Sequence, residues 1–590
     1  MRRTRRPVVA LLVTLLVVGL AVPAAAQTGP RPTPTFVNAT LRRMSLEEKV
    51  GQLFWTRVWG TGAHDRSAAA RNQTDFGVDT PAQVVEKYHL GGVLYFGYTG
   101  NVVDPAQLAR FSNDLQRVAL GGRRGVPLDL SIDQEGGIVA RLLAPWTEFP
   151  GNMAAGASGA DDLVAQQWAA TGEELRAVGI TTDFAPVVDV NTNPLNPVIG
   201  VRSFGEDPAL VGRLGAIATR ALQEQGVSAT LKHFPGHGDT EVDSHYGLPS
   251  VTYDRQTLEE VHLAPFRAAL ESDPDLVMSA HIVVDAVDPD LPATLSHPVL
   301  TGILREEMGY DGIIVTDALD MQGARDEFGD DRIPVMALQA GADVLLNPPD
   351  MEVAYQGVLA AVRSGEVSEA RVDESVRRIL ELKAERDQFR RPFVDEAALP
   401  QYIGTPEHLA VAARLGERAA TVVRNDDGVL PLAAGDGRST VAIGSAAAQP
   451  AVVAAGMSQR GYAASAITTA ATPTAAQIAQ ATAAADAADL AVVTTSSAWR
   501  SAAQQELVRS VVATGTPTVV LATRDAYDVG YLPTAMTAVA TYGTRRVSME
   551  GALAVLFGEV TPTGRLPVGI RSGVEGAPSY PIGHGLTYGD

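Results

Sequence analysis

The densest group of ionisable residues in the chain lies between Lys232 and Gly247. A short apolar run leads into Lys232 and His233, and the chain then breaks on one proline and two glycines. Three histidines and three acidic residues fall within this stretch. Such a cluster costs stability to assemble, and at the end of a buried strand it is typical of a functional site.

Two kinds of chemistry suit this loop. One is a metal site, because five residues of metal-ligand type stand close together, although their spacing matches no zinc pattern: His233, His237, Asp239, Asp243 and His245. The other is proton transfer, because Asp243 and His245 flank a single residue and can touch. A carboxylate partner fixes the imidazole tautomer and stabilises its protonated form, so His245 is a candidate general acid/base.

Two further acids stand where apolar runs end. Asp317 follows the run Gly312–Thr316, which predicts either a reactive carboxylate held at the end of a strand or a cap on the next helix. Asp133 follows another such run, and Gly136 and Gly137 after it allow a ligand or backbone to come close. A salt bridge to a neighbouring loop is the alternative for Asp133.

Two arginines lie in loops near these acids. Arg141 follows Asp133 by eight residues, and Arg202 lies in a glycine-flanked loop. The guanidinium group presents several donors in one plane, which suits sugar hydroxyls or carboxylates. The alternative is an ordinary surface arginine.

The composition limits the classes of protein to which the chain can belong. The 590 residues are 46% apolar and 19% charged, which is typical of a globular chain of two or more domains. The net charge of −21 leaves no basic face for nucleic acid beyond the extreme N-terminus. The absence of cysteine excludes disulfides, a cysteine nucleophile and thiolate zinc sites.

The N-terminus has the pattern of a secretory signal peptide. A basic start, an apolar run from Val8 to Val22 and a small-residue end at Ala24–Ala26 predict cleavage after about residue 26. We therefore expect a secreted or cell-wall-associated protein with no membrane segment after cleavage, and a spacer over residues 27–35. An uncleaved anchor is the alternative, although the run is short for a bilayer.

Residues 36–391 predict a (β/α)₈ TIM barrel, because short apolar runs alternate with stretches of helical spacing. The eight predicted strands are Leu53–Val58, Gly92–Phe96, Val126–Ile132, Thr181–Val188, Val227–Leu231, Leu276–Ala280, Gly312–Thr316 and Asp343–Leu346. Polar residues follow most of them, as at the C-terminal face of a barrel. An open doubly wound sheet would also place them on one edge, and the number of strands favours the barrel.

A linker is predicted over residues 392–406 and a second domain over 407–590. The second domain alternates strands with alanine-rich helices, which predicts an α/β layered domain with a mainly parallel sheet. Its predicted strands are Thr421–Arg424, Thr440–Ile443, Leu490–Thr494, Thr518–Ala522 and Thr537–Ala540. Its ionisable residues are scattered, so the chemistry is expected in the first domain.

Five motifs together resemble glycoside hydrolase family 3, and more narrowly its β-N-acetylglucosaminidase branch. They are Asp133-Gln134-Glu135-Gly136-Gly137, Arg202-Ser203-Phe204-Gly205, Lys232 to Thr240, Asp243-Ser244-His245 and Thr316-Asp317. They come in the order of the family and cover nearly all of the first domain. The second domain resembles the αβα-sandwich partner domain of the family, without a sharp motif.

The resemblance implies a role for each matched position. Asp317 would be the nucleophile, and His245 the acid/base with Asp243 as its partner. The hydroxyls of the sugar would be held by Asp133, Arg141, Arg202, Lys232 and His233. The reaction would be hydrolysis with retention through a covalent glycosyl-enzyme, without metal or cofactor. In the β-glucosidase branch the acid/base is instead a glutamate from the second domain.

The implied substrate is a glycan with terminal β-linked N-acetylglucosamine, from peptidoglycan fragments or chito-oligosaccharides. A phosphorylase that passes the sugar to phosphate, and a β-glucosidase or β-xylosidase, are the alternatives within the family. A non-catalytic wall-binding protein is the alternative from another class, although Asp317 and His245 are both present. The sequence leaves the oligomeric state open.

Overall fold

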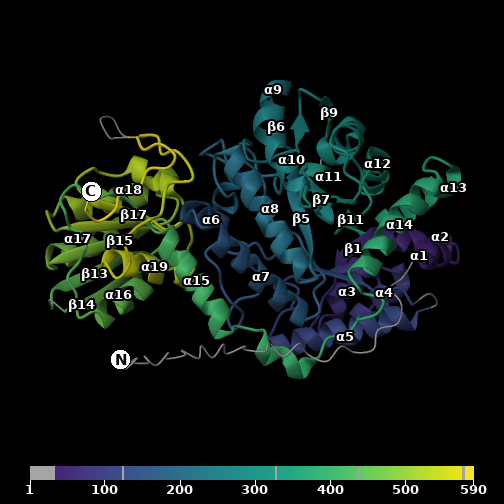
Figure 1. Ribbon diagram of the computed structural model, residues 1–590, viewed down its shortest axis with the longest axis horizontal. Coiled ribbons are helices and arrows are strands. Elements are labelled where there is room, and N and C mark those ends of the chain that lie inside the picture. The colour runs from purple at the N-terminus through teal and green to yellow at the C-terminus, as the bar shows by residue number, and fades with distance from the viewer. Residues whose placement is uncertain (1–33, 123–124, 326–327, 436, 574–578, 590) are drawn as a thin grey trace, which may run out of the picture.

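The computed structural model describes residues 34–122, 125–325, 328–435, 437–573 and 579–589 (Figure 1). The predicted signal peptide, residues 1–26, lies outside these ranges. The predicted spacer does too, except that its last two residues begin helix α1 (Pro34–Leu41). No helix in the described ranges is long and apolar enough to cross a membrane.

The first domain is a barrel of eight parallel strands that follow one another around the sheet in chain order. They are β1 (Phe54–Arg57), β2 (Gly92–Leu94), β3 (Asp129–Ile132), β4 (Thr182–Asp183), β5 (Ser228–Phe234), β7 (Leu276–Ser279), β10 (Ile313–Val315) and β11 (Leu345–Leu346). A parallel bridge between Val315 and Val344 joins the last two strands, while β1 pairs with β11. The predicted TIM barrel is confirmed.

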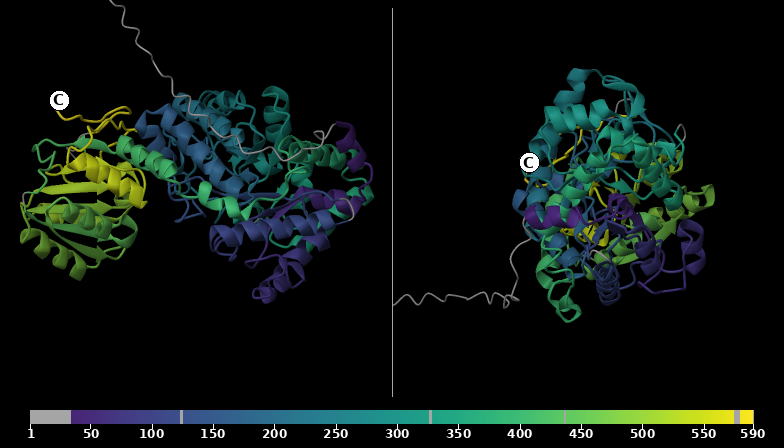
Figure 2. Two further views of the ribbon diagram at one scale, coloured as in Figure 1. Left: turned by 60° about the horizontal axis from the view of Figure 1, so that its bottom comes forward. Right: turned by 90° about the vertical axis from the view of Figure 1, so that its right-hand side faces the viewer.

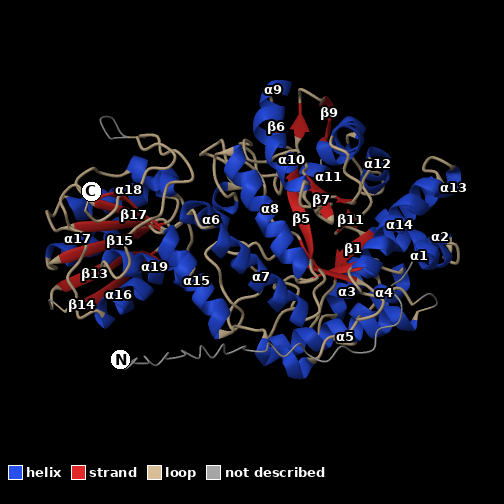
Figure 3. Ribbon diagram, in the orientation of Figure 1, coloured by secondary structure: helices blue, strands red, loops and turns tan. Residues whose placement is uncertain are grey.

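Helices surround the barrel, as Figure 3 shows by colour. They are α2 (Leu46–Leu53), α3 (Ala69–Phe76), α4 (Pro81–Tyr88), α5 (Pro105–Gly121), α6 (Asn152–Ser158), α7 (Asp161–Ala177), α8 (Pro208–Glu224), α9 (Arg255–Thr257), α10 (Ala264–Leu270), α11 (Gln322–Arg325), α12 (Ile333–Ala340), α13 (Met351–Ser364) and α14 (Glu369–Glu385). Local sequence fixes where many begin: the side chains of Thr80, Asp104 and Asp207 cap α4, α5 and α8, each followed by a proline in the first turn.

The observed barrel strands differ from their predicted bounds by one or more residues, and two of these differences bear on the site. The strand predicted over Thr181–Val188 is reduced to β4 (Thr182–Asp183), since Pro186 has no amide hydrogen for the ladder. The strand predicted to end at Leu231 runs on as β5 to Phe234. Lys232 and His233 therefore lie within a fully buried strand and not after it, which fixes their side chains more firmly than a loop would.

The sequence has helical spacing over Tyr253–Glu271 and Leu300–Met308, which predicts a helix in each, and both differ from a regular α-helix in the structure. The region Tyr253–Glu271 divides into α9, a π-helical stretch (Leu258–Leu263) and α10, where Pro265 cannot donate a backbone hydrogen bond. The predicted helix at Leu300–Met308 is a π-helix over Pro298–Glu307. A small sheet of β6 (Ser250–Val251), β8 (Val283–Val284) and β9 (Asp288–Pro292), absent from the prediction, lies beside them.

The second domain is an αβα sandwich beside the barrel (Figure 2). Its strands lie in the order β12-β17-β16-β15-β13-β14, and only β12 is antiparallel to its neighbour. They are β12 (Thr421–Arg424), β13 (Ser439–Ser445), β14 (Ala463–Thr469), β15 (Leu490–Thr495), β16 (Thr518–Ala522) and β17 (Thr537–Ala540). One apolar cluster includes α17 (Ala475–Asp486) and α18 (Ala502–Val512), and another includes α16 (Pro450–Gln459) and α19 (Arg546–Leu556).

The segment between the domains is packed against both of them. Residues Glu396–Gln401 form a short 3₁₀ helix that contacts α5. Helix α15 (Pro406–Ala419) follows at once and packs on α6 and α7 of the barrel and on α19 of the second domain. Hydrogen bonds also join the barrel directly to the second domain. For example, Asn191 donates to the Tyr527 hydroxyl at 2.9 Å, and Arg545 donates to the Gly137 carbonyl at 2.6 Å.

Candidate active site

A cavity of about 340 Å³ opens at the carboxyl ends of the barrel strands. Its lining residues lie between Leu94 and Asn347, so all of them come from the barrel. Of the eight predicted site residues, seven line it: Asp133, Arg141, Arg202, Lys232, His233, His245 and Asp317. Asp243 stands behind His245. The residues singled out from the sequence are thus brought together at one site.

One wall of the cavity is a buried cluster of charges around Glu135. The Glu135 carboxylate accepts two bonds from Arg202, at 2.8 and 2.9 Å, and lies 2.7 Å from the Lys232 Nζ. Burial would raise the pKa of Glu135, but Arg202 and Lys232 hold it well below its usual range. Glu135 therefore stays ionised and keeps both cations in place.

Lys232 also reaches Asp133. Its Nζ donates to Asp133 Oδ1 at 3.0 Å, and the other carboxylate oxygen lies 3.7 Å from Arg141. Burial would lower the pKa of Lys232, but Glu135 and Asp133 raise it above its ordinary value. An ammonium group has three donors, so these two bonds leave Lys232 one for a ligand.

His233 is oriented by a fully buried acid. Its Nδ1 lies 2.7 Å from Asp189 Oδ2, and its Nε2 is 3.3 Å from Arg202. Burial would raise the pKa of Asp189, but His233 and His237 outweigh it and lower the value. The carboxylate thus fixes the imidazole so that Nε2 faces the cavity side.

Asp317 lies two residues after the end of β10 and lines the cavity. Its Oδ1 accepts a hydrogen bond from the Ala318 amide at 2.8 Å, so it caps its own turn as well as facing the cavity. Burial would raise the pKa of Asp317, but His233, His281 and the Ala318 amide together lower it. The group is therefore an ionised carboxylate, as a nucleophile requires.

Asp243 and His245 form the predicted pair. The Asp243 carboxylate lies 2.7 Å from His245 Nδ1 and accepts the His245 amide at 3.0 Å. The side chain of His245 is 56% exposed, so its Nε2 is open to the cavity and to solvent. This arrangement permits transfer of a proton between His245 and a group bound beside Asp317.

The metal interpretation of the loop is not supported. His233, His237, Asp239 and His245 each have a different hydrogen-bond partner. Within the described ranges, no group of three or more histidine and acidic side chains is arranged to hold a metal ion.

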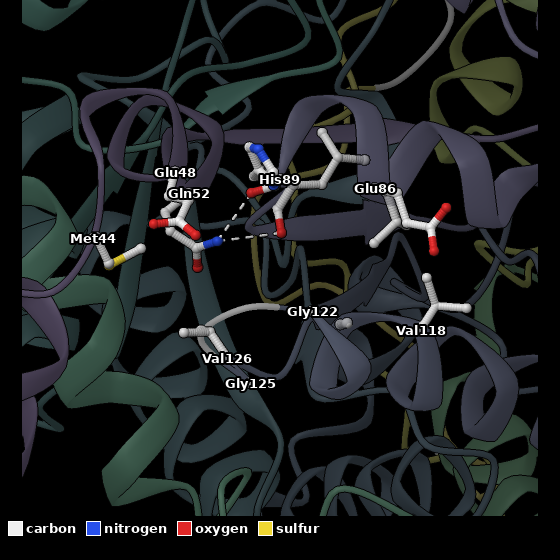
Figure 4. A pocket seen from close by; sticks show the side chains of 12 residues that line it. Met44, Glu48, Gln52, Glu86, His89, Val118, Gly122, Gly125 and Val126 are labelled. Carbon is white, nitrogen blue, oxygen red and sulfur yellow. Dashed lines mark hydrogen bonds between the residues drawn. The ribbon is translucent and has the colours of Figure 1, made fainter.

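A second cavity, of about 180 Å³, lies at the other end of the barrel (Figure 4). It is bordered by Leu90 and Val126, which precede β2 and β3, and by residues of α2. Gln52 points across it and donates to the carbonyls of His89 and Leu90, at 3.0 and 3.4 Å. None of the eight predicted site residues lines this second cavity.

Comparison with known proteins decides the family. Residues 45–382 match the family model for the glycosyl hydrolase family 3 N-terminal domain, and residues 420–588 match that for its C-terminal domain. The chain belongs to glycoside hydrolase family 3. The predicted family is thus confirmed on both domains.

Individual relatives show which members of the family the chain is similar to. The chain is 39% identical to beta-hexosaminidase A of Pseudoalteromonas piscicida over 60% of its length, and it spans 62% of that relative. It is 30% identical to a beta-N-acetylglucosaminidase/beta-glucosidase of Cellulomonas fimi, covering 67% of this chain and 68% of the other. The solved family 3 beta-N-acetylglucosaminidase of Paenibacillus sp. str. FPU-7 matches with a TM-score of 0.80 at 35% identity, over 90% of this chain and all of that one.

Several residues of the site had no role in the sequence analysis. Glu135 belongs to a family 3 motif, and its position two residues after Asp133 on a strand end was the available signal. Asp189 also follows a predicted strand. Asp320 lines the cavity and accepts a hydrogen bond from Arg57 at 2.9 Å, and His281 donates from Nε2 to the Ala318 carbonyl at 3.0 Å.

Asp183 lies under the site and predicts a pH dependence of stability. Burial raises its pKa from 3.8 to about 8, and its Oδ2 has no partner among the described residues. The folded protein therefore keeps the proton that the unfolded chain loses, so Asp183 lowers stability progressively as pH rises from about 4 to about 8. We expect Asp183→Asn to flatten this slope, because the amide keeps the bond from the Gln134 amide (2.8 Å) without a proton to lose.

Thermal unfolding of both proteins between pH 4.5 and 8 measures this effect. The variant should gain most over wild type at the upper end of the range. A gain that does not change with pH would contradict a protonated Asp183.

Proposed function

We propose that this family 3 chain is a retaining exo-β-N-acetylglucosaminidase that releases terminal β-linked N-acetylglucosamine by hydrolysis. The observation that carries the proposal is the pairing, in one cavity, of an ionised Asp317 with the Asp243–His245 pair. The names of the compared proteins support the choice of sugar.

In the first step, the Asp317 carboxylate attacks the anomeric carbon and the glycosidic bond breaks. His245 gives its proton to the leaving oxygen, and Asp243 stabilises the imidazolium before transfer. In the second step, His245 takes a proton from water, which attacks the same carbon and frees Asp317. Asp133, Arg141, Arg202, Lys232 and His233 hold the sugar hydroxyls during both steps.

The acid/base role of His245 predicts a dependence on the leaving group. His245→Ala should lower kcat/KM for phenyl β-N-acetylglucosaminide by about 10²–10³-fold. The value of kcat/KM for the 2,4-dinitrophenyl glycoside should fall far less, since its leaving group needs no proton. Steady-state kinetics on the two substrates measures the difference, and an equal loss on both would mean that His245 is not the acid.

We further propose that the substrates are peptidoglycan fragments or chito-oligosaccharides met outside the cytoplasmic membrane. The signal-peptide pattern of residues 1–26 supports this location. N-terminal sequencing of the protein recovered from the culture medium or cell wall tests it: mature protein should begin near residue 27, and a retained N-terminus in the cytoplasm would contradict it.

A phosphorylase is the second candidate, because the exposed imidazole of His245 repels a phosphate acceptor less than a carboxylate acid/base would. Incubation of 4-nitrophenyl β-N-acetylglucosaminide with and without phosphate, followed by product analysis, separates the two. We expect free N-acetylglucosamine in both cases.

The matching glucoside and xyloside should be poorer substrates, and a preference for either would overturn the choice of sugar.

A further inference from the structure

His237 lies in the same loop as the Asp243–His245 pair and has no part in the mechanism above. Only 1% of its surface is exposed, whereas the loop becomes exposed further along, at Glu241 and Val242. Its two ring nitrogens both have partners: Nδ1 lies 2.7 Å from Thr240 Oγ1, and Nε2 lies 3.0 Å from Ser244 Oγ. Ser244 is the residue between Asp243 and His245.

The hydrogen bonds of Thr240 determine the tautomer of His237. The Thr240 hydroxyl donates to the His237 carbonyl at 3.1 Å and accepts from Asn196 at 3.3 Å. Its remaining lone pair accepts from His237, so Nδ1 carries the hydrogen and Nε2 is an acceptor. Ser244 must then donate its hydroxyl hydrogen to Nε2. Burial, with His233 nearby, lowers the pKa of His237 to about 4, which keeps this neutral form.

Ser244 is the buried residue that anchors the exposed loop. Glu241, Val242, His245 and Tyr246 are all exposed, whereas Ser244 is 1% exposed. Besides the bond to His237, its carbonyl accepts the amide of Gly323 at 3.0 Å. A side chain at Gly323 would lie 2.9 Å from that carbonyl, so the loop is seated directly on the segment that follows Asp317.

The backbone of His237 is hydrogen-bonded to Asp189, the acid that also orients His233. Its backbone amide donates to Asp189 Oδ1 at 2.6 Å, while Asp189 Oδ2 holds His233 at 2.7 Å. A continuous set of hydrogen bonds therefore runs from His233 through Asp189 and His237 to Ser244. It connects the wall that binds hydroxyls to the loop that carries the proton donor.

We propose that the His237–Ser244 hydrogen bond is a positioning contact that holds the Asp243–His245 pair at its working distance from the leaving oxygen. Both residues line the cavity, and the role proposed for them is to act through His245 and not on the substrate. This inference rests on the proposed function, since it assumes that His245 transfers the proton.

Ser244→Ala tests the contact from one side and His237→Leu from the other. Each should lower kcat/KM for phenyl β-N-acetylglucosaminide by about 10-fold or more, with KM nearly unchanged, because a misplaced acid loses proton transfer first. The value of kcat/KM for the 2,4-dinitrophenyl glycoside should stay within about two-fold, since the first step on this substrate needs no acid. Ser250→Ala is the matched control, because it removes an exposed hydroxyl bonded to Asp285 at 2.9 Å near the same loop.

A double variant separates positioning from a general structural role. Adding Ser244→Ala to His245→Ala should cause no further loss on the phenyl glycoside, because Ser244 has no acid left to position. A further loss in that background, an equal loss on both substrates, or no loss in either single variant would overturn the positioning role. Absence of wild-type activity on both N-acetylglucosaminides would instead overturn the proposed function, and the positioning role with it.

Discussion

Asp317→Ala abolishes turnover on both activated and natural-type glycosides: we expect kcat to fall by about 10⁴-fold or more. The reason is that Asp317 is the carboxylate placed after β10 to attack the sugar, with one oxygen fixed by the Ala318 amide at 2.8 Å. Without it the covalent intermediate cannot form, and an activated leaving group does not help. Initial rates on the 2,4-dinitrophenyl glycoside measure the loss.

Asp311→Ala is the control for this substitution. Asp311 is an exposed acid just before the amino end of the same strand, on the far side of the barrel from the cavity. Its removal should leave kcat within about two-fold of wild type, as for an ordinary surface position. Residual activity in Asp317→Ala near that of the control would contradict the assignment of the nucleophile.

Glu135→Gln should have the second largest effect, on stability as well as on catalysis. Glu135 is 2% exposed and is the shared partner of two cations, the buried Lys232 and the 11% exposed Arg202. Removing one charge from a buried ionic cluster leaves the others uncompensated and costs about 3–5 kcal/mol in the free energy of unfolding. The same change frees two side chains that are proposed to hold the sugar, so KM should rise.

Denaturant unfolding and steady-state kinetics measure the two effects of Glu135→Gln. Glu550→Gln is the matched control, since Glu550 pairs with Arg546 on the exposed surface of α19, where such a pair contributes about 1 kcal/mol or less. If Glu135→Gln destabilises the protein no more than this control does, Glu135 does not hold the cluster together.

The parts of the site that were predictable are those in which one short segment carries both the strand and the reactive group. Asp317 is such a case, because a run of apolar residues ends directly at the acid. The Asp243–His245 pair is another, since two residues apart in a loop are close wherever the loop lies. These local signals, with the order of the motifs, were sufficient for the barrel and for seven of the residues that line the cavity.

The remaining parts depend on contacts between distant segments. The tautomer of His237 depends on the hydrogen bonds of Thr240, one of which comes from Asn196 in another loop, and the His237 amide is held by Asp189. The fold has similar gaps: β14 was not predicted because, as an edge strand with mostly exposed residues, it has neither a buried run nor a regular alternation. The shortening of β4 followed from Pro186, which interrupts a run that otherwise has the composition of a strand.

Covalent labelling tests the central claim most directly. A 5-fluoro derivative of N-acetylglucosamine with an activated leaving group slows the second step, so the glycosyl-enzyme accumulates and can be found by peptide mapping. We predict stoichiometric labelling of the peptide that contains Asp317, with loss of activity in parallel and no label in Asp317→Ala. A label on another carboxylate, or inactivation without any covalent adduct, would contradict the account.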